Sequence, residues 1–182
     1  MADLWLSLGS NLGNREATLL DALRALEARG LHVRAVSSMY ATAPQGTTDQ
    51  PEFLNCVARM QTDLPAREAL RRCQEVEALY GRERTLRWGP RTLDIDLVFY
   101  DNLVSTDANL ELPHPRLWER AFVLAPLLEL WPDLTTPGGE PASDVLRRLS
   151  LSQRVQRVDQ SNTSGCIAAR ATVQVTGEEH TG

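Results

Sequence analysis

The sequence contains no lysine, and all 19 of its basic side chains are arginine. This absence excludes a Walker-type phosphate-binding lysine and Schiff-base chemistry, so arginine must do any cationic work on phosphate. The three cysteines, Cys56, Cys73 and Cys166, are odd in number and widely spaced, which argues against a disulfide framework or a cysteine metal site. Cys56 and Cys73 lie in apolar-periodic segments, so we expect both in the core.

Long apolar runs are missing as well. No segment reaches transmembrane length, and the first residues lack the basic start and apolar core of a signal peptide. We therefore expect a cytoplasmic protein that makes no contact with a membrane. The formal net charge of −5 at pH 7 argues against general nucleic-acid binding. No feature indicates an obligate protein partner.

The apolar periodicity predicts a mixed fold. Strands are expected over residues 3–8, 31–40, 53–61 and 92–100, and helices over 14–30 and 65–81. The order strand, helix, strand, strand, helix, strand predicts an α+β fold with a ferredoxin-like β-α-β-β-α-β core, in which an antiparallel sheet carries its helices on one face.

The remaining segments have weaker patterns. Extra C-terminal helices are expected over residues 117–130 and 143–149, and residues 41–52 are predicted to form a long exposed loop. Beyond about residue 159 the chain is small, polar and aperiodic, which is typical of disorder. We therefore expect one domain over residues 1–158 and a polar tail over 159–182.

The most informative stretch is RERTLRWGPRTLDIDLVFY at residues 82–100. Its alternation predicts a strand on which Leu93, Ile95, Leu97 and Phe99 face one way and Asp94 and Asp96 face the other. The two aspartates would lie roughly 6.5–7 Å apart, a spacing that suits a divalent cation. Four nearby arginines would suit phosphate oxygens; they are Arg82, Arg84, Arg87 and Arg91. A solvated strand face is the plainer alternative for a D-x-D pair alone.

Other candidate positions carry weaker signals. Phe53 and Asn55 share one strand face, where an aromatic ring beside an amide suits a planar heterocycle. A surface phenylalanine beside a solvated asparagine fits the strand equally well. The Gly9-Ser10-Asn11 segment fits an ordinary turn better than a ligand site. Glu77 shares a helical stripe with apolar residues, so a structural salt bridge to the following arginines is favoured over catalysis. His114 lies between two prolines, where phosphate contact is about as probable as a structural role.

Together these pieces resemble the 6-hydroxymethyl-7,8-dihydropterin pyrophosphokinases of folate biosynthesis. The similar segments run in consistent order through residues 3–150: LGSNLG at 8–13, SSMYATAP at 37–44, DQPEFLN at 49–55, GRER at 81–84, RWGPRTLDIDLVFY at 87–100 and LPHPRLWERAFVLAPLLEL at 112–130. RWGPRTLDIDL is the most specific of them. One departure is Ala43, which stands where the family commonly has proline.

The resemblance implies an enzyme that transfers pyrophosphate from ATP to the pterin hydroxymethyl group, releases AMP and uses two Mg²⁺ ions. It implies that Asp94 and Asp96 hold both metal ions, and that the catalytic set also includes Arg82, Arg84 and Arg91. ATP would contact Gln74, Glu77, Arg82, Arg84, Arg91, His114 and Arg120. The pterin would contact Thr42, Ala43, Pro44, Gln45, Phe53, Asn55, Trp88 and Phe122.

Two alternatives remain at this level. A palm-like nucleotidyltransferase or cyclase also places paired aspartates on a ferredoxin-like sheet, but it would leave the Phe53, Asn55 and Phe122 set without a role. A non-catalytic ferredoxin-like binding module would require neither aspartate.

Overall fold

The computed structural model describes residues 1–43, 51–80 and 93–158. In this part of the chain the strands are β1 (Ala2–Ser10), β2 (His32–Val36), β3 (Tyr40–Thr42), β4 (Phe53–Thr62), β5 (Asp94–Tyr100), β6 (Ser105–Asp107), β7 (Leu110–Leu112) and β8 (Val155–Arg157). The α-helices are α1 (Arg15–Glu27), α2 (Ala66–Leu79), α3 (Ala121–Leu130) and α4 (Ala142–Leu149), and a short 3-10 helix covers Leu117–Glu119.

The main sheet has the order β5-β1-β4-β3-β8, and β2 also pairs with β4. All of these pairings are antiparallel. If β2 and β3 are taken as two pieces of the second predicted strand, the four core strands lie in the order fourth, first, third, second. The predicted ferredoxin-like β-α-β-β-α-β core is therefore confirmed.

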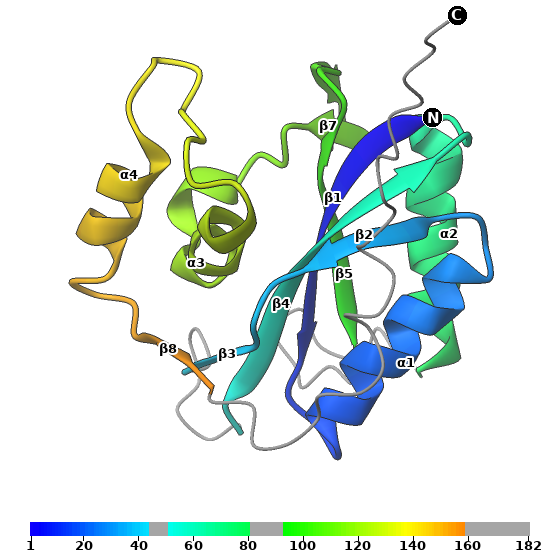
Figure 1. The fold of residues 1–182 in the computed structure, drawn as a ribbon, viewed down its shortest axis with the longest axis horizontal. Coiled ribbons are helices and arrows are strands. Elements are labelled where there is room, and N and C mark those ends of the chain that lie inside the picture. Colours follow the sequence, from blue (N-terminus) through cyan, green and yellow to red (C-terminus); the bar gives the residue numbers. More distant parts are fainter. Residues whose placement is uncertain (44–50, 81–92, 159–182) are drawn as a thin grey trace, which may run out of the picture.

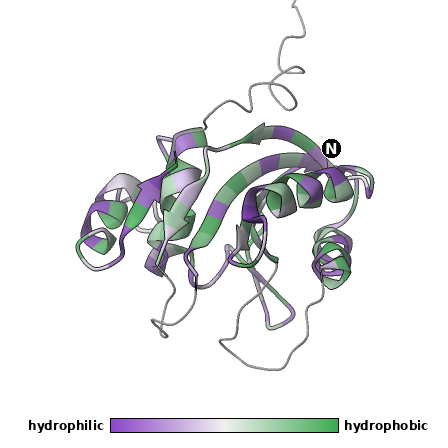
Figure 2. Ribbon diagram, turned by 90° about the horizontal axis from the view of Figure 1, so that it is seen from below, coloured by the Kyte–Doolittle hydropathy of each residue, from purple (hydrophilic) through white to green (hydrophobic). Residues whose placement is uncertain are grey.

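Helices cover both faces of this sheet (Figure 1). On the first face, α1 and α2 pack against β1, β4 and β5, and their apolar residues form one buried cluster. On the second face, α3 and α4 pack over Trp5, Val57 and Val98 and form another. The layers can also be followed from below in Figure 2, where hydrophobic and hydrophilic positions intermingle along the ribbons. The C-terminal helices thus leave the second face only partly open.

Both core helices begin where predicted, while the predicted stop of α2 at Gly81 lies outside the described residues. The Asn14 side chain accepts a hydrogen bond from the Ala17 backbone amide and caps α1. Gly30, at φ +85°, allows the chain to turn after this helix. Pro65 immediately precedes α2. Cys56 and Cys73 lie in the core, as predicted, while Cys166 is outside the described residues.

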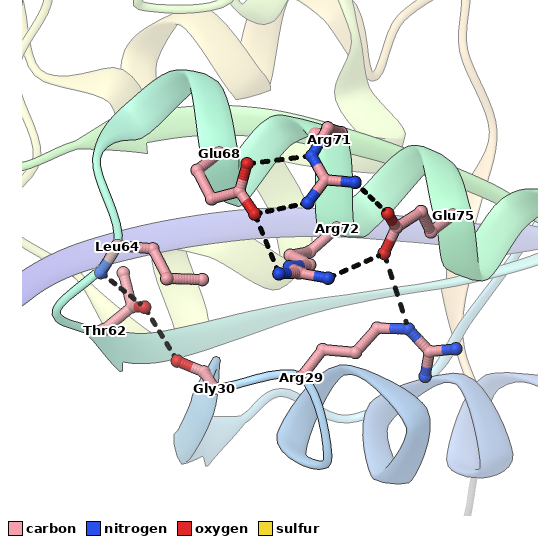
Figure 3. Close-up of polar contacts among 8 residues, drawn as sticks. All are labelled: Arg29, Gly30, Thr62, Leu64, Glu68, Arg71, Arg72 and Glu75. Carbon is pink, nitrogen blue, oxygen red and sulfur yellow. Dashed lines mark hydrogen bonds and ion pairs between the residues drawn. The ribbon is translucent and has the colours of Figure 1, made fainter.

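Helix α2 is fixed to the end of α1 by charged side chains (Figure 3). Arg71 and Arg72 each form ion pairs with both Glu68 and Glu75. Arg29, in the loop after α1, places its Nε 3.9 Å from Glu75 Oε2. Exposed pairs of this kind contribute little individually, and only the Arg29–Glu75 pair among them joins α2 to another segment.

One predicted orientation was wrong. Phe99 was expected to share a face with Leu97, but it packs against the second-face cluster while Leu97 lies in the first. The cause is a β-bulge: Trp5 pairs with Phe99 and Leu6 pairs with Leu97, so Val98 is an extra residue in β5. Strict alternation therefore holds from Leu93 to Val98 and fails after it.

Three further boundaries also differ from the prediction. The second predicted strand is divided at residues 37–39, and its continuation, β3, takes up Ala41 and Thr42 from the expected loop. The helix expected over 117–130 is interrupted at Arg120, which has an extended backbone (φ −118°, ψ 100°). The β6–β7 hairpin and strand β8 were not predicted. None of the helices in the described ranges has the length and hydropathy needed to span a bilayer.

Candidate functional site

Three strands bring the predicted site residues together at one end of the second face. Gly9 of β1 pairs with Asn55 of β4 on one side and with Asp94 of β5 on the other. Ser7 pairs with Asp96 two residues further along. Because adjacent strands lie about 4.8 Å apart, the Cα atoms of Asn55 and Asp94 are roughly 10 Å apart across Gly9. The predicted pterin residue and the predicted metal residues thus lie in neighbouring positions of one sheet.

Asp96 is held by two side chains from the segment before α3. Arg120 Nη1 donates to Asp96 Oδ2 at 2.7 Å, and His114 Nε2 lies 3.8 Å from Asp96 Oδ1. The Asp96 side chain is 29% exposed and that of Arg120 is 17% exposed, so the ion pair is partly shielded from water. The break in helix at Arg120 explains this contact, because the extended residue directs its side chain back to β5.

His114 has a defined neutral form. Burial lowers the pKa of His114, the nearby Asp96 carboxylate opposes this, and Arg120 and Arg116 lower the pKa further. The lowered pKa favours the neutral ring. Its Nδ1 accepts a hydrogen bond from the Arg116 backbone amide at 3.2 Å, which leaves the proton on Nε2, facing Asp96. His114 can thus offer a neutral N–H donor beside the carboxylate.

Arg120 also connects Asp96 with Phe122. The Arg120 guanidinium carbon lies 5.6 Å from the centre of the Phe122 ring, a cation–π arrangement. Phe122 is half-buried and packs against the second-face cluster, while Phe53 at the start of β4 is also half-buried. The gap between these two rings stays a prediction.

Asn55 is fixed in a buried position, with 3% of its surface exposed. Its Nδ2 donates to Thr42 Oγ1 at 2.9 Å, which joins two of the predicted pterin residues. A Cβ atom at Gly9 would lie 2.7 Å from Asn55 Oδ1, closer than real Cβ contacts allow. The absence of a side chain at Gly9 therefore leaves the space that the Asn55 side-chain amide occupies. Gly9 was predicted to form part of a turn but lies inside β1, where a glycine is a known signal of close approach by another group.

The two predicted ATP residues of α2 lie in different surroundings. Gln74 lines an open hollow of about 400 Å³ between α2 and the β6–β7 hairpin, together with Arg67, Leu70, Arg71, Ala108 and Asn109. Glu77 instead points into the sheet layer, is 2% exposed and accepts a hydrogen bond from the Ile95 backbone amide at 2.8 Å. The predicted arginine partners of Glu77 at residues 82–91 lie outside the described residues.

The two aspartates fit a magnesium site. They offer oxygen ligands from one strand face and both are partly exposed, whereas no group of three or more potential ligands occurs among residues 1–43, 51–80 and 93–158. Mg²⁺ commonly takes only one or two protein carboxylates and completes its shell with water and substrate phosphate. The donor set therefore suits a cation that arrives with a phosphate ligand.

Several predicted site residues lie outside the described residues. They are Pro44, Gln45, Arg82, Arg84, Trp88 and Arg91. Ala43 is described and directly follows β3.

Comparison with known proteins gives a consistent result. The family model of 7,8-dihydro-6-hydroxymethylpterin-pyrophosphokinase (HPPK) matches residues 5–132. The 2-amino-4-hydroxy-6-hydroxymethyldihydropteridine pyrophosphokinase of Methylorubrum extorquens is 43% identical over 160 residues, covering 87% of this chain and 100% of that protein. The mitochondrial folate synthesis bifunctional protein of Arabidopsis thaliana is 45% identical over 125 residues, which are 69% of this chain but 23% of the relative.

Solved structures agree on the fold. An HPPK-DHPS structure in complex with substrates has a TM-score of 0.64 at 12% identity, covering 83% of this chain and 44% of that chain. A Plasmodium falciparum HPPK-DHPS triple mutant also gives 0.64, at 13% identity. The matched family region includes the strand with both aspartates, the amide of β4 and the arginine before α3. The chain therefore belongs to the 7,8-dihydro-6-hydroxymethylpterin-pyrophosphokinase family.

Proposed function

We propose that this protein transfers pyrophosphate from ATP to the hydroxymethyl group of 6-hydroxymethyl-7,8-dihydropterin and releases AMP, in folate biosynthesis. The observation that carries the proposal is the sheet row in which Asn55 and Asp94 flank Gly9. This row places Asn55, whose amide would bind the pterin ring, near Asp94, whose carboxylate would bind the cation. A pterin held at Asn55 would extend its side group toward Asp94 and Asp96.

Asp94 and Asp96 would hold two Mg²⁺ ions together with the ATP phosphates. Bound there, Mg²⁺ supplies positive charge to the attacking and leaving oxygens. Arg120 and His114 already face Asp96 as donors. When a polyphosphate is present, both donors can turn to its oxygens without crossing the site. The arginines of residues 82–91 would add further donors, as the resemblance implies.

Pterin recognition would use the β3–β4 end of the sheet. Asn55 keeps Oδ1 and one N–H after its bond to Thr42, which is the donor–acceptor pair needed to read the edge of a pterin ring. Phe53 and Phe122 would cover the two faces of the ring. Residues 42–45 and Trp88 complete the set that the resemblance implies.

The reaction forms one bond and breaks one bond. The pterin hydroxyl oxygen bonds to the β-phosphorus of ATP, the bond between that phosphorus and the oxygen bridging to the α-phosphate breaks, and AMP leaves with that oxygen. The hydroxyl proton passes to solvent. No side chain of the described site stands out as a general base, because His114 Nδ1 already accepts the Arg116 amide.

The direct test is product analysis of the purified protein with ATP, Mg²⁺ and the hydroxymethyl pterin. We expect AMP and the pterin diphosphate in equal amounts, and no AMP without the pterin. Release of pyrophosphate from ATP would instead support a palm-like nucleotidyltransferase or cyclase. Calorimetry with an ATP analogue and Mg²⁺, with and without pterin, separates both enzymes from a non-catalytic binding module.

A further inference from the structure

Glu77 is a carboxylate inside the apolar layer between α2 and the sheet. Its exposed fraction is 2%, and its α2 neighbours Cys73 and Val76 belong to the fully buried core. Burying a carboxylate is costly unless hydrogen-bonding or charged partners compensate for the lost water. An acidic side chain at this position therefore calls for a specific reason.

Glu77 contacts the backbone of the strand that carries the aspartates. Its Oε1 accepts from the amide of Ile95, the residue between Asp94 and Asp96, at 2.8 Å. Strand β5 is the outer strand of the sheet on this side. Successive amides of a strand point to opposite edges, so those of Asp94 and Asp96 face β1 while that of Ile95 faces outward. Glu77 thus satisfies an edge amide that β1 cannot reach.

Glu77 also lies one helical turn after Cys73 on α2. The pKa of Cys73 is raised to about 12, first by burial, then by the charge of Glu77, with a further contribution from Asp96. Glu77 therefore links α2 to the strand segment between the two aspartates.

We propose that Glu77 is a positioning residue, which fixes the backbone of β5 at Ile95 so that Asp94 and Asp96 hold the spacing and direction needed to bind the cation. The proposal rests on the proposed function for the identity of the cation–phosphate ligand. It gives Glu77 a different role from the ATP contact that the family resemblance implies. A charged acceptor makes the stronger bond to an amide, which explains why glutamate rather than glutamine suits the position.

The test compares Glu77→Gln with Glu75→Gln, which removes the same charge two residues away on the same helix. Three quantities are measured: Mn²⁺ affinity by electron paramagnetic resonance with a non-hydrolysable ATP analogue, exchange of the Ile95 amide by NMR, and kcat and KM for ATP. For Glu77→Gln we expect Mn²⁺ affinity and kcat to fall roughly 10–100-fold. Ile95 exchange should accelerate, and KM for ATP should change less. Glu75→Gln should leave all three near wild type.

Opposite results would overturn the proposal. A raised KM for ATP with unchanged Mn²⁺ affinity and Ile95 exchange would make Glu77 an ATP contact. If Glu77→Gln does not fold, Glu77→Asp replaces it, since its carboxylate is one methylene too short for Ile95; wild-type Mn²⁺ affinity in Glu77→Asp would refute the role. In wild type, exchange of Ile95 at the rate of an exposed edge amide would refute the contact itself.

Failure of the proposed function is distinguishable from failure of this inference. Mn²⁺ binding and amide exchange are measured without turnover. A wild-type protein that forms no AMP, but loses Mn²⁺ affinity in Glu77→Gln, would refute the reaction and retain the positioning role.

Discussion

The two faces of the main sheet have different compositions. On the face under α1 and α2, β1, β4 and β5 present an unbroken series of buried apolar side chains, including Leu4, Leu6, Leu8 and Ile95. On the second face, the apolar series is confined to the part beneath α3 and α4. At the end near Gly9 it gives way to polar residues and a residue without a side chain. The first face therefore mainly provides stability, and the end of the second face carries the residues of the proposed site.

The largest expected effect comes from removing either aspartate, which should reduce catalysis while the protein stays folded. Asp94→Ala and Asp96→Ala should each lower kcat by at least about 10³-fold, or about 4 kcal/mol of transition-state stabilisation. The fold should survive, because both side chains point away from the first-face core. Steady-state kinetics at saturating Mg²⁺, with circular dichroism for folding, checks this. Retention of most activity by either variant would refute the two-carboxylate site.

The matching change on the first face should affect stability instead. Leu26 is fully buried on α1. Leu26→Ala should lower the free energy of unfolding by about 2–5 kcal/mol, because it leaves a cavity. Denaturant unfolding measures this loss. At a temperature where the variant is folded, kcat per folded molecule should equal wild type; a large fall in kcat would show that the two faces are not separable.

A smaller effect, on pterin affinity, is expected from changes at Asn55 and at Gly9, which pair with each other in the sheet. Asn55→Ala should weaken pterin binding by about 1–3 kcal/mol, the cost of leaving a buried polar group unpaired. Gly9→Ala should weaken it comparably, because the new Cβ displaces Asn55 Oδ1. Calorimetry on the single and double variants forms a cycle. If Gly9 acts through Asn55, Gly9→Ala should add little to Asn55→Ala, and full additivity would contradict this.

The smallest effect concerns cation binding without nucleotide. Arg120 occupies Asp96 Oδ2 in the present structure. Arg120→Ala should therefore raise the Mn²⁺ affinity of the nucleotide-free protein, by up to about ten-fold or about 1.4 kcal/mol, while lowering turnover with ATP. Arg116→Ala is the control, since it removes a nearby positive charge that pairs with Glu119 rather than Asp96. Equal gains in Mn²⁺ affinity in both variants would indicate that the change in net charge alone causes the effect.

Sequence reasoning anticipated the site where local patterns are strong. The alternation over Leu93–Leu97 correctly oriented Asp94 and Asp96, and the β4 pattern correctly placed Asn55 opposite the core. It failed at Phe99, because a bulge depends on how two strands pair and leaves no mark in the periodicity of one. It also failed at Arg120, where a continuous helical pattern runs through a residue whose contact with Asp96 is 24 positions away in the sequence.

The sequence by itself determined the β-α-β-β-α-β order, the Asn14 cap of α1, the Pro65 start of α2 and the family motif with its paired aspartates. These follow from local propensity and spacing, which act over a few residues. Only the tertiary structure decided that Gly9 lies between Asn55 and Asp94, that Arg120 reaches Asp96 and that Glu77 holds Ile95. Each of these contacts joins segments far apart in the chain, and its geometry is set by strand register and helix packing rather than by either segment alone.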